Sequence, residues 1–237
     1  MTVYSSSIQN QTNVFTFYSE DSNDLVNLIT SGVDHRYQGV ELGIEANITP
    51  TWTLTAAYAD GMHVFTDRPT VTQVIDELDA FQDGETAFIE GYRVGRTPQQ
   101  AMSIGATYRS PKFWFAGLNY NHFNDIWIQP IGTRRTNSAV ENLIEEDPQF
   151  ERFTSQTELD DGGALNFFAG KSWMFRKDER RYFLLLTLNM TNVLDNTDFV
   201  TGGYEQGRPN VANVDLFGDR LGFMWGRTYF AMLRLSF

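Results

Sequence analysis

Val40-Glu41-Leu42-Gly43-Ile44-Glu45-Ala46-Asn47-Ile48 is the stretch that decides the fold of this chain. Every second residue in it is apolar, and the residues between are Glu, Gly, Glu and Asn. Successive side chains of a β-strand point to opposite faces of a sheet, so the stretch predicts a strand with one apolar and one polar face. Soluble antiparallel sheets show the same alternation, so this strand alone does not identify what its apolar face contacts.

The same alternation returns along the chain and predicts an all-β protein of antiparallel strands. Eight strands are expected, at 1–19, 35–49, 52–65, 99–109, 113–129, 163–175, 181–194 and 226–237. Two of them are less regular than the others. Lys171 is a charged residue at a position that alternation assigns to the apolar face, so it would face lipid unless its ammonium group reaches the rim. Residues 181–188 are apolar on both faces, so alternation does not assign their inward side.

Short and long connections alternate between these strands. The short ones are Pro50-Thr51, Ser110 to Lys112 and Arg176 to Arg180, and the long ones span about 20–34, 66–98, 130–162 and 195–225. Structureless loops of about thirty residues are unusual in a compact soluble domain. Transmembrane barrels have an even number of strands, short turns on one rim and long loops on the other. The connections therefore favour a transmembrane antiparallel β-barrel.

Aromatic residues at the short turns favour the same fold. The rings beside these turns are Trp52, Phe113, Trp114, Trp173, Phe175 and Tyr182. Amphipathic rings prefer the headgroup level of a bilayer, so this spacing predicts an aromatic girdle at one rim. No stretch approaches the ~20 consecutive apolar residues that a membrane helix needs, which excludes a helical membrane protein. A soluble sandwich that acts as a binding module is the distant alternative.

The net charge, the lack of cysteine and the N-terminal residues limit which partners and which compartment are expected. The net charge is −12, from 30 acidic and 18 basic residues. An acidic chain without a basic patch is a poor nucleic-acid binder. The chain has no cysteine, so neither a disulfide nor a thiolate metal site is expected. Met1-Thr2-Val3-Tyr4 lacks the features of a signal peptide, and we therefore expect a chain that begins inside a longer protein or lacks its leader.

Three stretches together resemble the C-terminal half of a TonB-dependent outer-membrane receptor of the kind common in Bacteroidota. Tyr37 to Leu42, followed by Pro50 and the strand Trp52 to Tyr58, is similar to the Y/H-x-G-V-E strand and hairpin of these barrels. Leu188 to Asp195 resembles their N-V-x-N-L-x-D element. Gly226 to Phe237 resembles their G-R-x-x-x-x-x-L-R-x-x-F ending.

The resemblance implies an outer-membrane transporter that takes up a scarce ligand, namely a siderophore, a glycan or a peptide. Receptors of the family that the chain resembles form a ~22-stranded barrel that is plugged by an N-terminal domain. Residues 1–237 would then be the last eight strands, with the plug absent from this chain. The implied partners are outer-membrane lipid and lipopolysaccharide, the remaining strands and plug, TonB through that plug and, where one accompanies the barrel, a surface lipoprotein.

Candidate site residues lie in the long connections and at the C-terminus. The aromatic residues suited to stacking on a ligand are Trp127, Phe199, Tyr204 and Trp225. The resemblance implies a C-terminal insertion signal made of Tyr229, Ala231, Leu233, Leu235 and Phe237. Polar residues expected to line the lumen are Glu41, Glu45, Asn47, Thr53, Thr55, Ser103, Thr107 and Arg109. Asn192 and Asp195 lie where a strand enters a loop, and short side chains that bond the backbone suit that exit.

Enzymatic and metal chemistry are not expected. His35, His63 and His122 lack a metal-ligand pattern and are expected in loops or at the rims. Gly202 to Gly207 precedes no helix and is expected to shape a loop rather than to hold a phosphate. No cofactor is assigned. The acidic loops are also suited to bridging divalent cations on lipopolysaccharide.

A second function stays open at this point. Eight strands could form a self-contained barrel with a packed polar interior and a structural or adhesion role. Pairing of the first strand with the last would distinguish this barrel from a piece of a larger one.

Overall fold

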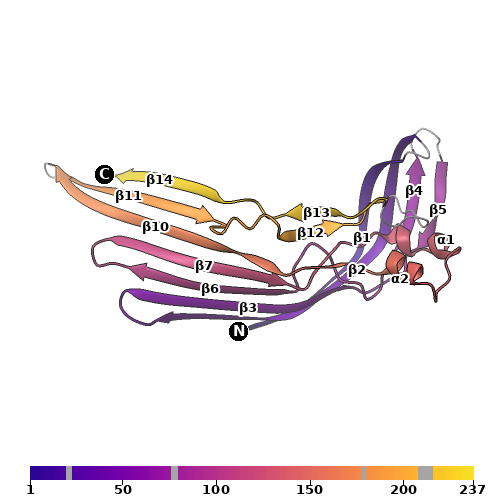
Figure 1. Cartoon of the computed structure of the whole chain (residues 1–237), viewed down its shortest axis with the longest axis horizontal. Coiled ribbons are helices and arrows are strands. Elements are labelled where there is room, and N and C mark those ends of the chain that lie inside the picture. The colour runs from indigo at the N-terminus through magenta and orange to yellow at the C-terminus, as the bar shows by residue number, and fades with distance from the viewer. Residues whose placement is uncertain (20–22, 76–79, 178–179, 208–215) are drawn as a thin grey trace.

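The computed structural model shows a long antiparallel β-sheet that carries a folded head at one end (Figure 1). The head consists of the described residues of the three long connections, 66–99, 125–161 and 192–227. It describes residues 1–19, 23–75, 80–177, 180–207 and 216–237. The long strands of this part are β1 (Thr2–Ser19), β2 (Asp24–Asn47), β3 (Trp52–Phe65), β6 (Gln100–Arg109), β7 (Trp114–Asn124), β10 (Gly162–Lys177), β11 (Arg180–Thr191) and β14 (Thr228–Ser236). Their order across the sheet is β14-β11-β10-β7-β6-β3-β2-β1, and every pair is antiparallel, as the sequence predicts.

The register brings the apolar positions of β2 to β14 onto one face. One row of directly opposed residues crosses seven strands without a break: Ala46, Leu54, Ala106, Leu118, Phe167, Met190 and Tyr229. Large side chains on this face, such as Ile44, Ile104 and Leu118, are exposed. A contiguous exposed apolar surface of this kind marks an interaction surface.

The opposite face is polar over the first strands of the same array. A row beside the previous one holds Glu45, Thr55, Gly105, Asn119 and Asn166. The Nδ2 of Asn119 donates a hydrogen bond to Ser103 Oγ at 2.8 Å, and Thr53 Oγ1 donates one to Asn47 Oδ1 at 2.8 Å. The register therefore places the expected lumen-lining residues together on one face.

The sheet is open. β1 pairs with β2, β14 pairs with β11, and in the described part of the chain these two outer strands do not pair with each other. The fold prediction is therefore confirmed as a mostly antiparallel sheet, and barrel closure is not seen within this chain. A self-contained eight-stranded barrel needs the missing pairing.

β2 is longer than expected and connects the sheet to the head. Its C-terminal half pairs with β3, and its N-terminal half pairs with β4 (Thr70–Ile75), which lies beside β5 (Ala80–Thr86). The expected long connection over 20–34 is wrong, because β2 already begins at Asp24 and pairs there with β1. The two strands shift register near Gly32, whose φ of +72° suits a residue without a Cβ.

The other long connections carry regular structure, which corrects the expectation of structureless loops. Besides β4 and β5 they contain β8 (Ile126–Trp127), the 3-10 helix η2 (Gly132–Arg135), α1 (Asn137–Val140), α2 (Pro148–Thr154), β9 (Glu158–Leu159), β12 (Val200–Tyr204) and β13 (Arg220–Phe223). Gly202 and Gly203 belong to the β12–β13 hairpin rather than to a loop. β7 ends at Asn124 instead of 129, because Asp125 takes a left-handed φ of 53° that a strand cannot continue.

Two apolar clusters attach the head to the adjacent end of the sheet. The first consists of Val33, Phe65, Ile89 and Val94, with Tyr37 and Tyr92 packed against it. The second consists of Leu28, Val71 and Ala87, with Phe15, Phe17 and Ile131 packed against it. None of the described helices is long and apolar enough to cross a membrane.

Asn192 ends β11 with a hydrogen-bonded turn. Its φ is 49°, its Oδ1 accepts a hydrogen bond from Asn196 N, and its Nδ2 donates to Asn196 O and to Trp225 O, all at 3.0 Å. Asp195 Oδ1 accepts a hydrogen bond from Arg227 N at 2.7 Å. The prediction that Asn192 and Asp195 shape this strand exit is confirmed.

Candidate functional site

The head is organised around a buried ion pair between Arg135 and Glu205. Arg135 ends η2, and Glu205 follows β12 directly. The Nη2 of Arg135 donates to Oε1 of Glu205 at 2.7 Å, and Nη1 donates to Oε2. Both side chains are only 2% exposed. The contact therefore fixes the β12–β13 hairpin against η2.

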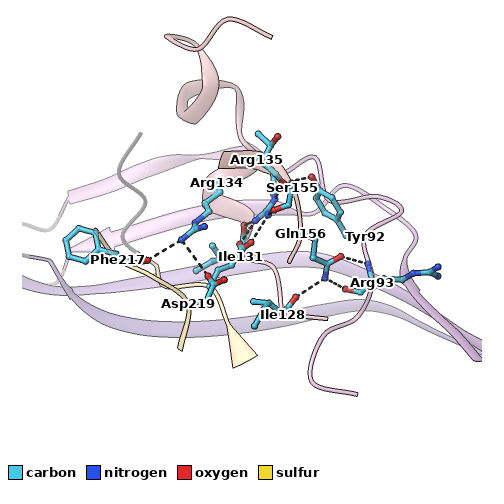
Figure 2. Close-up of polar contacts among 12 residues, drawn as sticks. Tyr92, Arg93, Ile128, Ile131, Arg134, Arg135, Ser155, Gln156, Phe217 and Asp219 are labelled. Carbon is cyan, nitrogen blue, oxygen red and sulfur yellow. Dashed lines mark hydrogen bonds and ion pairs between the residues drawn. The ribbon is translucent and has the colours of Figure 1, made fainter. Parts of the chain in front are cut away.

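Backbone carbonyls satisfy the rest of the Arg135 guanidinium (Figure 2). Nε donates to Thr154 O at 2.9 Å, Nη2 to Ser155 O at 2.9 Å and Nη1 to Ile131 O at 3.1 Å. Burial by itself lowers the pKa of Arg135, but the hydrogen bonds and charge of Glu205 raise this pKa above its ordinary value. Arg135 therefore stays charged, and all five of its N–H donors have acceptors.

Tyr92 and Gln156 connect this ion pair to neighbouring segments. The ring of Tyr92 lies 5.0 Å from Arg135 Cζ, and its hydroxyl donates to Thr154 O at 2.8 Å. The Nε2 of Gln156 donates to Arg93 O at 2.7 Å and to Ile128 O at 2.8 Å, while its Oε1 accepts from Arg93 N at 2.8 Å. Figure 2 shows these residues gathered beside η2. These contacts tie residues 92–93, 128 and 154–156 to Arg135 and to one another.

Arg134 makes a looser contact on the other side of η2. Its Nη2 lies 3.4 Å from Phe217 O and 4.0 Å from Asp219 Oδ1 (Figure 2). Burial and the charge of Glu205 raise the pKa of Asp219, and the two arginines oppose this shift. Arg134 thus contacts Phe217 and Asp219 over longer distances than the 2.7 Å between Arg135 Nη2 and Glu205 Oε1.

A small pocket opens between β1 and the β12–β13 hairpin. Its volume is about 220 Å³, and it is lined by Phe15, Phe17, Tyr18, Tyr204, Gln206, Gly207 and Arg220. The rings of Phe15 and Tyr204 meet edge to face at 5.9 Å. Arg220, one of the lining residues, is exposed. Ring faces beside an arginine are suited to hold one planar or sugar-like group.

The structure places the four residues expected to bind ligand in different environments. Tyr204 lines the pocket, and Trp225 is 86% exposed away from it. Phe199 is buried, stacked in parallel on Phe123 at 6.3 Å, and Trp127 is half-buried with its Nε1 donating to Asp125 Oδ1. Ligand binding by these residues stays a prediction, and Tyr204 is the one of the four that lines the pocket between β1 and the β12–β13 hairpin.

The expected C-terminal signal lies on the apolar face of β14. Tyr229, Leu233 and Leu235 are exposed there, opposite Met190, Leu186 and Leu184. Ala231 lies opposite Leu188, and Phe237 is 87% exposed. Recognition of these residues by an assembly machinery stays a prediction.

The histidines expected in loops or at the rims lie in strands, and His63 and His122 are within two residues of the strand ends. His35 lies in β2, His63 in β3 and His122 in β7. No group of three His, Cys, Asp or Glu side chains that could hold a metal ion occurs among the described residues.

Sequence reasoning missed Arg135 and Glu205. They lie 70 residues apart in two different connections, and no local pattern links them. The one signal available was the pair of adjacent arginines, Arg134 and Arg135, in a connection that is rich in acidic residues.

Comparison with known proteins gives a structural likeness and no sequence relative. No protein-family profile matches the chain, and no curated protein matches it. Among solved structures, it is similar to the closed form of the ferric-catecholate import receptor Fiu from E. coli K12, with 15% sequence identity and a TM-score of 0.42. The match covers 98% of this chain and 27% of the Fiu chain, so this chain spans about a quarter of the length of that receptor. No residue role or ligand follows from a likeness of this degree.

Proposed function

We propose that this chain forms part of the wall and the outer face of a TonB-dependent outer-membrane transporter. The observation that carries the proposal is the unbroken apolar row from Ala46 to Tyr229, backed by a polar row on the other face. A sheet with these two faces suits a barrel wall that contacts lipid outside and water inside. The localisation that follows is the outer membrane.

Aromatic rings support this orientation. Trp52, Tyr108 and Trp114 form a ladder at the short-turn end of the sheet, with ring centroids 5.1 and 4.9 Å apart. Tyr58 and Tyr120 lie at the head end of the same apolar face. Two levels of amphipathic rings are what a bilayer with two interfaces selects.

The open edges argue for further strands. Unpaired backbone groups along β1 and β14 would be costly in hydrocarbon, where no water can satisfy them. We infer that additional strands of the same polypeptide close the wall, and that a plug inside it couples to TonB. Lipid and lipopolysaccharide would surround the wall, and a surface lipoprotein is a further partner of this proposal.

The head would capture the ligand. It stands on the long-connection side of the sheet, has the rigid Arg135–Glu205 pair at its centre and offers the pocket beside Tyr204 and Arg220. A siderophore, a glycan or a peptide could place one ring or acidic group there, and energised import would follow.

Membrane insertion is tested with neighbouring residues on opposite faces. Residues 1–237 hold no cysteine, so a fluorophore on Leu118→Cys or on Asn119→Cys labels one site once any cysteine in the additional strands is replaced by serine. Lipid-borne quenchers in outer-membrane vesicles should quench the label at 118 and spare the label at 119. Equal quenching at both positions would contradict the proposed wall.

Transport is tested by uptake of a ferric catecholate, a maltodextrin and an oligopeptide into cells that make the full-length protein. One of the three should accumulate, and a protonophore should abolish its accumulation. Tyr204→Ala and Arg220→Gln should reduce binding, whereas Arg96→Gln, an exposed arginine outside the pocket lining, should not. Accumulation that persists without the proton gradient would contradict TonB-dependent import.

A further inference from the structure

Two of the three histidines are buried where the sheet meets the head. His35 is 7% exposed and His63 is 9% exposed. Their rings belong to a ladder that crosses three strands, with centroid separations of 4.6, 6.0, 5.0 and 6.4 Å along Phe65, His35, Tyr37, His63 and Tyr4. Both lie on the head side of the apolar band, beyond Leu42 and Tyr58.

Neither imidazole has the partners that a charged ring requires. The Nε2 of His63 lies 3.0 Å from the Tyr4 hydroxyl, but its Nδ1 has no hydrogen-bond partner. The Nδ1 of His35 has none either. Both nitrogens of a protonated imidazole are donors, so protonation would leave a buried N–H unpaired in each ring.

The surroundings of both rings favour the neutral form. Burial lowers the pKa of His35, and the charge of Asp34 only partly opposes it. Burial and the charge of Arg93 lower the pKa of His63, against Asp125. The remaining ionisable groups around the ladder are the phenols of Tyr4, Tyr37 and Tyr92, with Glu41 and Asp60 beyond Tyr4.

Residues 89–99 run along the C-terminal half of β3 and contact the strand segment that holds His63. Val94 N donates to His63 O at 2.9 Å, and His63 N donates to Gln99 Oε1 at 2.6 Å. Phe65 exchanges two further hydrogen bonds, from Gly91 N to its carbonyl and from its N to Tyr92 O, both at 2.9 Å. Ile89 and Val94 pack on Phe65, whose ring is 4.6 Å from His35.

We propose that His35 and His63 form an acid-sensitive latch that holds residues 89–99 on β3 at neutral pH and releases them when both rings are protonated. Release would also loosen the head, because Tyr92 lies on Arg135 and Arg93 is bonded to Gln156. This regulation goes beyond the proposed function and requires neither a ligand nor transport.

The direction of the pH effect follows from linkage. In the latched state the pKa of each histidine lies below its ordinary value of 6.5, so the latched state binds protons less readily than the released state does. The latch is therefore fully stable above that value and loses stability as the pH falls below it. Within this window the released population rises by up to about tenfold per pH unit for each histidine.

The test follows the mobility of residues 89–99 directly. Thr97 is exposed and residues 1–237 hold no cysteine, so a nitroxide on Thr97→Cys reports on this segment alone once any cysteine elsewhere in the full-length protein is replaced by serine. In the full-length protein in lipid vesicles, the spectrum should show an immobile label at about pH 7.5 and a growing mobile component towards about pH 5. The double variant H35Q/H63Q should remove this pH response.

His122 supplies the matched control. Its side chain is 29% exposed and its Nε2 lies 3.1 Å from Asp161 Oδ2, so this ring is accessible to solvent and has a polar partner. His122→Gln should leave the pH response intact. A label whose mobility does not change with pH, or a response that survives in H35Q/H63Q, would overturn the latch.

A second measurement covers the case in which the double variant does not fold. Imidazole resonances of histidine-labelled protein, assigned through the single His→Gln variants, give each midpoint in the wild type. Midpoints for His35 and His63 below the ordinary value of 6.5 support the latch. Midpoints at or above the ordinary value for either buried ring overturn it.

Discussion

Arg135 and Glu205 form a two-pronged ion pair that is almost completely excluded from solvent, although the two residues are 70 positions apart in the chain. The pair joins η2 to the β12–β13 hairpin. Desolvating two charges is costly, and the cost is offset here because every donor of Arg135 also meets a protein acceptor. The head is therefore specific in its arrangement and sensitive to the loss of either partner.

Glu205→Gln should destabilise the head strongly. The variant leaves a buried arginine without its counter-ion, and breaking such a pair typically costs about 3–5 kcal/mol. Protease resistance of the head in vesicles, measured against urea, should show the loss. Glu90→Gln is the matched control, because its partner Arg68 is 54% exposed and surface pairs contribute about 0–1 kcal/mol. Similar losses in both variants would contradict the role of burial.

Asn192→Ala should weaken the exit of β11. The substitution removes three side-chain hydrogen bonds. It also leaves a residue that has a Cβ, but no polar group to bond the nearby backbone, at a φ of 49°. Asn192→Gly keeps the backbone conformation and loses only the hydrogen bonds, so it should cost less than alanine. Thermal melting of the reconstituted protein ranks the two variants. A melting temperature lower for glycine than for alanine would show that the backbone conformation is unimportant.

Gly117→Ala should disturb the inner face of the sheet. A Cβ on Gly117 would approach the edge of the Phe168 ring to under 3.0 Å, closer than real Cβ contacts allow, so the ring would have to move. Overpacking of this kind costs about 1–3 kcal/mol. Gly43→Ala is the control, because nothing lies within 4 Å of its added Cβ. Urea midpoints of the two variants should differ, and equal midpoints would contradict the close approach.

Acid should detach α1 from β5. Ser138 donates from its hydroxyl to Glu85 at 2.7 Å, and this hydrogen bond is the largest cause that lowers the pKa of Glu85 below 4.5. A depressed pKa stabilises the folded state above the ordinary value, and that stability is lost as the pH falls through the folded value. Ser138→Ala should reduce the acid dependence of a spin label on Asn142→Cys. A label with the same acid profile in both proteins would contradict this contact.

The strand framework could be predicted because alternation is local. The strands at 52–65 and 99–109 have the expected bounds to within a residue, since period 2 needs only consecutive residues to be recognised. The exit at Asn192 was also predictable from side-chain chemistry. The regular structure in the long connections was missed, because short strands and helices such as β4 and α2 depend on their tertiary partners.

The candidate site was far less predictable. Tyr204 lines a pocket, whereas Phe199 is buried against Phe123, and composition alone does not distinguish a ring that packs inside from one that faces a ligand. Arg135 and Glu205 carry no local signature at all. Contacts of this kind depend on how separate connections fold over one another.

The sequence by itself determined the eight long strands, apart from the early start of β2, and the apolar face of those strands that alternate regularly. The tertiary structure alone decided the side on which the ambiguous 181–188 segment places its residues, because only pairing with β10 and β14 puts Leu184 and Leu186 on the apolar face and Phe183 beside Ser236. It likewise placed Lys171 opposite Trp114, with its ammonium 5.6 Å from the Trp173 ring. The physical reason is that alternation depends on neighbours in the chain, whereas register and buried charge pairs depend on residues that only folding brings together.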